Sequence, residues 1–362
     1  MNGSAIAHFG LARQYRNLKE ELLDATNQAL KEGCLMSGPF TNKFETWLAL
    51  KTGTEFAVTV HSGTQALEII ALFLRSQWFV TVQSEMKPSV YIPNITYPAT
   101  LNAFINADWD IELVDTDKNG LLNQEHINRL QMFSYICTVG LYGAKTPDAT
   151  SNHIVDGAQH WLIADKNTMG VGMAISFDPT KNLPSSGNGG AIVTNNRDLY
   201  DFAYSYRSNG KSDHKSHGTN SRMGELDCAH LLVRTKHIEN WQWRRKEIRH
   251  YYLDEFKNLD LHCLSRNFMV HADQKFVVYT ERKKELFEHL INAGIDVKIH
   301  YEKALSELPL AKNIDVKPDM LSTSVMLTKG LLSLPIYPEL TDGEVEYIAK
   351  EVKKFFTYSV HH

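Results

Sequence analysis

Cysteine is scarce in this sequence, and long apolar runs are missing. The four cysteines are Cys34, Cys137, Cys228 and Cys263. They lie far apart without any Cys-x-x-Cys pair, a pattern typical of reduced thiols in a cytoplasmic protein. The apolar runs are too short to span a bilayer, and residues 1–14 lack the charged and then apolar stretch of an export signal. We therefore expect a cytoplasmic protein with no membrane partner.

An excess of positive charge is also missing. The formal net charge is −4, and the basic cluster Arg244-Arg245-Lys246 lies in a helical run with Glu239 and Glu247. Mixed charges of this kind are typical of a solvated helix face. Because nucleic-acid binding would require a broader basic stripe, we expect no nucleic-acid partner.

Several common catalytic signatures are absent as well. No GxxxxGK loop is present, which excludes a P-loop ATPase. The glycine-rich run 187–190 precedes a strand candidate, whereas a dinucleotide-binding glycine loop must precede a helix. His214 and His217 have no cluster of cysteines or carboxylates at ligand spacing, so we interpret the segment 213–217 as a polar loop and predict no metal site.

The length and the apolar content are sufficient for two domains. The chain has 362 residues, of which 43% are hydrophobic, and domains average about 150 residues. In its first part, strand candidates alternate with helix-length stretches, which predicts an α/β fold with a mostly parallel sheet and ligands outside the strand ends. The strand candidates are 56–60, 89–93, 111–115, 134–139, 153–156, 173–177 and 190–194.

A smaller α+β domain is predicted to follow this sheet. One long helix over 238–259 would form a bridge between the two parts. The other predicted elements are strands at 275–279 and 295–299 and helices near 282–293 and 342–356. We therefore expect a large domain over residues 1–240 and a small domain over 241–362.

Lys181 is the most informative residue of the chain. It lies between two short apolar strand candidates, after Thr180 and before the glycine-rich run 187–190. A lysine normally titrates near pKa ~10.4, and desolvation lowers that value, which makes the amine able to form a Schiff base with a carbonyl cofactor. The alternative is a lysine whose ammonium extends from the end of a strand into solvent.

Asp156 and Gln159 follow another strand candidate. A carboxylate there could pair with a pyridinium nitrogen, and a carboxamide could reach a phenolate oxygen, which are the protein groups that pyridoxal 5′-phosphate (PLP) requires. The alternative for Asp156 is a helix cap after a strand. A third segment, Ser62-Gly63-Thr64, separates the strand candidate 56–60 from an apolar helix, and the free N–H groups of such a helix start favour a phosphate.

Together these segments resemble the DegT/DnrJ/EryC1/StrS family of PLP-dependent sugar aminotransferases. Further matches follow in the family's order along most of the chain. They are Gly38-Pro39 with Phe44-Glu45, the run from Pro93 to Ala103, Arg207-Ser208-Asn209-Gly210, Gly218-Thr219-Asn220-Ser221-Arg222-Met223, His300-Tyr301 and Ser333-Leu334-Pro335. The resemblance implies an aspartate-aminotransferase-like PLP fold (fold type I), with a mostly parallel seven-stranded sheet and a smaller α+β C-terminal domain.

The resemblance implies a role for each matched residue around PLP. Lys181 would hold the cofactor as a Schiff base and later move protons. Asp156 would face the pyridine nitrogen, Gln159 would face the ring hydroxyl, and Tyr97 would stack on the ring. Offset stacking contributes ~0.5–1.5 kcal/mol beyond burial, so Tyr97 would mainly orient the ring. The alternative for Tyr97 is a core aromatic residue.

The resemblance also implies a phosphate site and a homodimer. Gly63 and Thr64 would bind the phosphate at the helix start, with the Ser176 hydroxyl as a further donor. Asn220 would reach the phosphate of the neighbouring subunit, so the two active sites would be shared. The alternatives are a strand-end cap for Ser176 and an ordinary loop residue for Asn220.

Some residues depart from the family's pattern. Asn188 stands where the family usually has an acidic residue, and the stretches 142–153 and 159–176 are shorter than usual. These departures lie around the cofactor strands and remove no cofactor contact, so they bear on the substrate more than on the reaction. Lys181 itself favours transamination, because related dehydratases have histidine at that position.

The resemblance therefore implies a PLP-dependent aminotransferase. It would transfer an amino group from an amino acid, with L-glutamate as the expected donor, to a nucleotide-linked keto-sugar, with a 4-keto-6-deoxyhexose as the expected acceptor, in amino-sugar biosynthesis. The acceptor would contact the segment 208–221 and the region around His300 and Tyr301. The alternatives are a non-catalytic PLP-binding regulator, or an aminotransferase for a 3-keto sugar or a cyclitol.

Overall fold

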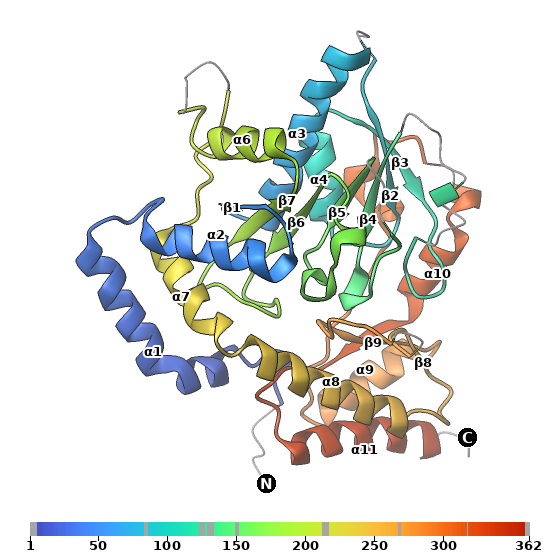
Figure 1. The fold of residues 1–362 in the computed structure, drawn as a ribbon. Coiled ribbons are helices and arrows are strands. Elements are labelled where there is room, and N and C mark those ends of the chain that lie inside the picture. Colours follow the sequence, from blue (N-terminus) through green and yellow to red (C-terminus); the bar gives the residue numbers. More distant parts are fainter. Residues whose placement is uncertain are drawn as a thin grey trace.

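The fold consists of a large mixed sheet covered by helices and a small sheet with its own helices (Figure 1). The computed structural model describes residues 6–82, 86–122, 127–128, 134–148, 152–211, 217–266, 269–316 and 318–358. Most of the polar segment 213–217 lies outside these residues. Within the described residues, no helix has both the length and the hydropathy needed to cross a membrane.

The large sheet has seven strands in the order β1-β7-β6-β5-β4-β2-β3. The strands are β1 (Phe56–Val60), β2 (Ser89–Pro93), β3 (Asp110–Val114), β4 (Tyr135–Val139), β5 (His153–Asp156), β6 (Gly172–Ser176) and β7 (Gly190–Thr194). β7 is antiparallel to both of its neighbours, and all other pairs are parallel. The predicted mostly parallel sheet of seven strands is therefore confirmed, with each strand within about one residue of its predicted bounds.

Helices cover both faces of this sheet (Figure 1). Val58 and Val60 of β1 enter a core with α3 (Gly63–Val82) and α4 (Pro98–Asn106), whereas Ala57, just before Val58, enters a second core with α2 (Pro39–Thr52). This alternation follows from the two-residue period of a strand. The other helices of this part are α1 (Leu11–Glu32), α6 (Arg197–Tyr206) and α7 (Glu225–Thr235).

The C-terminal part contains an antiparallel sheet in the order β10-β9-β8. Its elements are α8 (Ile238–Glu255), β8 (His262–Cys263), β9 (Phe276–Tyr279), α9 (Lys283–Asn292), α10 (Ser322–Gly330), β10 (Leu331–Leu334) and α11 (Asp342–Tyr358). The long helix predicted over 238–259 is α8, and it lies between the large sheet and α11 in Figure 1. Ile6 from the start of the chain also packs into the C-terminal core, so both ends of the sequence build this part.

The prediction of a strand over 295–299 is wrong. This segment makes only two isolated bridges, one from Ile295 to Ile6 and one from Lys298 to Ser333. Its apolar residues Ile295 and Val297 are buried in the C-terminal core, so the sequence has the pattern of a strand. A strand also needs a neighbour with continuous pairing, and here the two partners come from different segments and each pairs with a single residue.

Candidate active site

One cavity of about 430 Å³ lies at the carboxyl ends of several strands of the large sheet. Ligands of open α/β sheets bind at this edge. Because β7 runs antiparallel, Asn188 and Gly189 before its first residue reach the same edge. The cavity is lined by seven of the eight predicted site residues, which are Gly63, Thr64, Tyr97, Asp156, Gln159, Ser176 and Lys181. Asn220 is not among the lining residues.

Lys181 follows β6 in a tight turn. Its backbone N–H donates to the Asp178 carbonyl at 2.9 Å, and the Asp178 carboxylate accepts from the backbone N–H of Thr180 at 2.9 Å. In the described part of the chain, the Lys181 ammonium has neither a hydrogen bond nor an ion pair. Burial lowers the pKa of Lys181, while the carboxylates of Asp156 and Asp178 act in the opposite direction. A free amine with a lowered pKa is suited to nucleophilic chemistry.

Asp156 is the last residue of β5 and is almost fully buried. Its carboxylate accepts from the Thr100 hydroxyl at 2.8 Å and from the Ala158 backbone N–H at 3.1 Å. Burial raises the pKa of Asp156, and these hydrogen bonds and the charge of Lys181 counteract that rise. The helix-cap alternative does not hold, because no α-helix begins in the described stretch 157–171. Asp156 is therefore a buried carboxylate that faces the cavity.

Gln159 connects the cavity to the C-terminal part. Its Oε1 accepts from the Tyr142 backbone N–H at 2.7 Å, and its Nε2 donates to the Tyr301 hydroxyl at 3.3 Å. Burial raises the pKa of Tyr301, so this phenol stays protonated. Tyr301, matched in the sequence as a substrate-facing residue, therefore lies beside the predicted cofactor residue Gln159.

The turn before α3 has the geometry of an anion cradle. Ser62 caps the helix by accepting from the Gln65 backbone N–H at 3.2 Å. Gly63 lies so close to β6 that a Cβ atom there would come within 2.8 Å of the Ser176 Cβ. Glycine thus allows the first N–H groups of α3, which have no partners within the helix, to sit beside the Ser176 side chain.

Tyr97 and Asn220 both lie at the surface. Tyr97 is 60% exposed, which excludes the core-aromatic alternative, and its ring centroid is 6.1 Å from that of Tyr301. Asn220 is exposed in a segment that pairs with Ser208. Ser221 fixes this segment to the turn between β1 and α3, because its carbonyl accepts from the His61 backbone N–H at 2.7 Å.

Other matched motifs have structural contacts. Arg207 is almost fully buried and donates to the Glu45 carboxylate at 2.5 Å and to the Thr59 carbonyl at 2.7 Å, which joins the segment after α6 to β1. Glu225 accepts from the backbone N–H groups of Gly38 and Thr41 at the start of α2. These charged side chains hold the helices around the cavity and do not line it.

Lys275 is a cavity residue that the sequence analysis did not identify. It immediately precedes β9, is 7% exposed and lines the same cavity as Lys181. The available signal was a lysine at the first position of the otherwise apolar strand candidate 275–279. His300 joins it from the C-terminal part.

Comparisons with known proteins agree with this geometry. The model of the DegT/DnrJ/EryC1/StrS aminotransferase family matches residues 16–353. The erythromycin biosynthesis sensory transduction protein EryC1 of Saccharopolyspora erythraea is 28% identical over 95% of this chain and 97% of its own length. The dTDP-3-amino-3,4,6-trideoxy-alpha-D-glucose transaminase of Streptomyces venezuelae is 27% identical over 95% and 94%.

A solved structure has the same fold. The structure of S. venezuelae DesV in complex with a ketimine intermediate superposes with a TM-score of 0.87 at 25% identity, over 98% of this chain and 99% of that chain. The family match covers nearly all of the described sequence, and the expected fold type I architecture is confirmed. The chain therefore belongs to the DegT/DnrJ/EryC1/StrS aminotransferase family.

Proposed function

We propose that this protein is a PLP-dependent aminotransferase that transfers an amino group from an amino acid, with L-glutamate as the expected donor, to a nucleotide-linked keto-sugar. The observation that carries the proposal is the single cavity that contains a partner-free amine, a buried carboxylate and an anion cradle, at Lys181, Asp156 and Gly63. The S. venezuelae relative is named a transaminase of a dTDP-linked sugar, which supports the acceptor class.

The residues of the cavity fit PLP. The cradle at Gly63, Thr64 and Ser176 suits a phosphate, because it offers free N–H groups at a helix start and hydroxyl groups nearby. Asp156 would hold a proton at the ring nitrogen, since its carboxylate is buried and faces the cavity. When bound, PLP supplies an electron sink for the carbanion at the substrate carbon.

Lys181 and Gln159 would complete the site. The Lys181 Nζ would attach the cofactor covalently and, once released, would carry a proton away from the substrate carbon. Gln159 would orient the ring through its carboxamide, which the Tyr142 backbone and the Tyr301 hydroxyl hold in place. Tyr97 would cover the ring from the solvent side, because it is exposed at the mouth of the cavity.

The proposed site is completed by a second subunit. Asn220 is exposed, lies outside the cavity lining and is fixed to the turn before α3 through Ser221. These facts support a contact made across a homodimer interface, in which Asn220 donates to the phosphate of the partner subunit.

A regulatory function is the second candidate, because the EryC1 relative is named a sensory transduction protein. The presence of Lys181, Asp156 and Gln159 in one cavity favours catalysis, since a protein that only binds PLP would need the phosphate cradle and not a proton carrier. A 3-keto sugar is the alternative acceptor, because the S. venezuelae relative is named for a 3-amino sugar.

The first experiment tests attachment at Lys181. Protein purified with PLP should be yellow, and borohydride should fix the label on the peptide that contains Lys181. Lys181→Ala should abolish amino transfer from glutamate to a panel of 4-keto and 3-keto nucleotide sugars, with products identified by mass spectrometry. The control is Lys284→Met, which changes an exposed lysine of α9. A label on another lysine, or turnover in Lys181→Ala, would contradict the assignment.

A further inference from the structure

Lys275 is a second buried amine in the active-site cavity, and within the described residues no carboxylate pairs with it. Only 7% of the residue is exposed, and within the described residues its ammonium makes neither a hydrogen bond nor an ion pair. Its Nζ lies 5.6 Å from the centroid of the Phe9 ring. Burying a charged group without a partner is costly, so an unpaired buried lysine in a cleft requires an explanation.

The groups around Lys275 are mostly basic. Burial, together with the charges of Lys181 and Arg245, lowers the pKa of Lys275 to about 7, and the charge of Asp178 acts in the opposite direction. His8 and His300 also face it, and burial lowers their pKa values to about 4 and about 2, so both rings are neutral near pH 7. An anionic ligand would find uncompensated positive charge here, and its arrival would keep Lys275 protonated.

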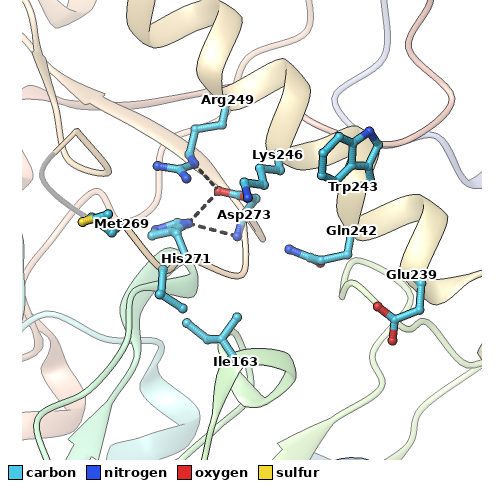
Figure 2. A pocket seen from close by; sticks show the side chains of 10 residues that line it. Ile163, Glu239, Gln242, Trp243, Lys246, Arg249, Met269, His271 and Asp273 are labelled. Carbon is cyan, nitrogen blue, oxygen red and sulfur yellow. Dashed lines mark hydrogen bonds and ion pairs between the residues drawn. The ribbon is translucent and has the colours of Figure 1, made fainter.

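The segment before Lys275 is fixed to α8. A second cavity, of about 290 Å³, lies beside this segment. Among its lining residues, Arg249 and His271 converge on Asp273 (Figure 2). The Asp273 carboxylate lies 2.7 Å from the Arg249 guanidinium and 2.9 Å from the His271 ring. This buried cluster holds the backbone two residues before Lys275 and therefore limits where its side chain can go.

The same segment is also fixed to the turn that contains Lys181. The Asn182 side chain donates to the Ala272 carbonyl at 2.5 Å, and the Gln274 side chain donates to the Thr180 carbonyl at 3.1 Å. These two bonds join the residues on either side of Lys181 to the residues just before Lys275. The two amines are thus parts of one rigid unit, although 94 positions separate Thr180 from Gln274.

We propose that Lys275 binds the α-carboxylate of the amino donor, an inference that rests on the proposed aminotransferase function. In an α-amino acid the nitrogen and the carboxylate are attached to the same carbon. When the nitrogen lies beside Lys181, a cation fixed next to Lys181 can therefore reach the carboxylate. The cofactor phosphate has its own cradle at Gly63, on a different element. The acceptor sugar carries no charged group beside its keto carbon, so a cation at the reacting carbon would have no anionic group of the sugar to bind.

Steady-state kinetics of three variants test this assignment. Lys275→Met should raise the half-saturating donor concentration about tenfold or more, which corresponds to about 1.4 kcal/mol, because it removes a charge-assisted hydrogen bond. Lys275→Arg keeps the charge and should stay within about threefold of wild type. The half-saturating concentration of the keto-sugar should change less than about threefold in both. Lys284→Met, an exposed lysine of α9, is the control.

Two further measurements do not depend on turnover. Glutarate, which resembles the donor but carries no amine, should bind the wild-type holoenzyme in calorimetry. Its affinity should fall from about pH 6 to about pH 9 as Lys275 loses its proton, and Lys275→Arg should keep the affinity over this range. Glutarate should also protect Lys275 of the apoprotein from an amine-labelling reagent followed by mass spectrometry. Lys275→Met should melt at the same or a higher temperature, because it removes a buried charge that makes no ion pair with any described residue.

The outcomes separate this inference from the proposed function. If no donor is turned over, the proposed function fails, while glutarate binding and labelling still decide the role of Lys275. If transfer occurs and Lys275→Met leaves the half-saturating donor concentration unchanged, the assignment of Lys275 is wrong. It is also wrong if the variant raises the half-saturating concentration of the keto-sugar instead. A Lys275→Met protein that unfolds would also overturn it, because that result would make the lysine structural.

Discussion

Replacing Asp156 by asparagine separates the electrostatic role of this residue from its structural one. In the structure its carboxylate accepts one hydrogen bond from the Thr100 hydroxyl and one from the Ala158 backbone, and the residue lines the cavity. Asparagine has the same shape and can still accept one of these bonds. The substitution therefore removes the negative charge and leaves the packing of β5 nearly unchanged.

The expected loss of rate follows from the burial of the carboxylate. Removing one partner of a buried ion pair costs about 3–5 kcal/mol. Since each 1.36 kcal/mol changes a rate tenfold, turnover of Asp156→Asn should fall by roughly 10²-fold to 5 × 10³-fold. The affinity for PLP should fall less than about tenfold, because the cradle at Gly63 and the amine of Lys181 are intact.

Stability provides the internal control for this variant. Burial raises the pKa of Asp156, so the folded apoprotein holds this proton to a higher pH than the unfolded chain does. The contribution of this group to stability is complete below the unfolded pKa and is lost as the pH rises through the folded pKa. At neutral pH and above, apo Asp156→Asn should therefore melt at the same or a higher temperature than wild type.

The assay combines single-turnover kinetics with glutamate, a PLP titration followed by absorbance, and a thermal melt of the apoprotein. Asp201→Asn, which changes an exposed carboxylate of α6, is the matched control. Turnover within about threefold of wild type would refute the assignment of Asp156 to the ring nitrogen. A lower melting temperature would instead attribute the loss of activity to the fold.

The other two predictions concern the cradle and the assembly. Gly63→Ala places a Cβ atom 2.8 Å from the Ser176 Cβ and should weaken PLP binding about tenfold in a titration. Gly187→Ala is the control, because the nearest atom to its added Cβ lies 3.9 Å away, and it should bind PLP as wild type does. Equal affinities of the two variants would contradict the cradle. Mixing inactive Lys181→Ala and Asn220→Asp subunits should restore roughly a quarter of the activity if sites are shared across a two-fold dimer. Exchange confirmed with tagged chains but without recovered activity would show that Asn220 acts in its own subunit.

The sequence by itself determined the large sheet and the position of most cavity residues along it. The seven strands were predictable because alternating or continuous apolar residues indicate a strand in a segment as short as five residues, as at 56–60 and 190–194. Asp156 and Ser176 end their strands, and Lys181 follows β6 closely, so the common edge of parallel strands brings them together. The prediction failed at 295–299, where burial produces the pattern of a strand but no continuous partner is present.

Only the tertiary structure decided the surroundings of these residues. The partners of Gln159 come from Tyr142 and Tyr301, and Lys275 reaches the cavity because side chains of α8 and of the Lys181 turn hold the segment before it. The position of Asn220 likewise follows from its bridge to Ser208 and from the bond of the neighbouring Ser221 to the turn before α3. The physical reason is that hydrophobic periodicity is a property of neighbouring residues, whereas the convergence of residues far apart in sequence depends on how whole elements pack.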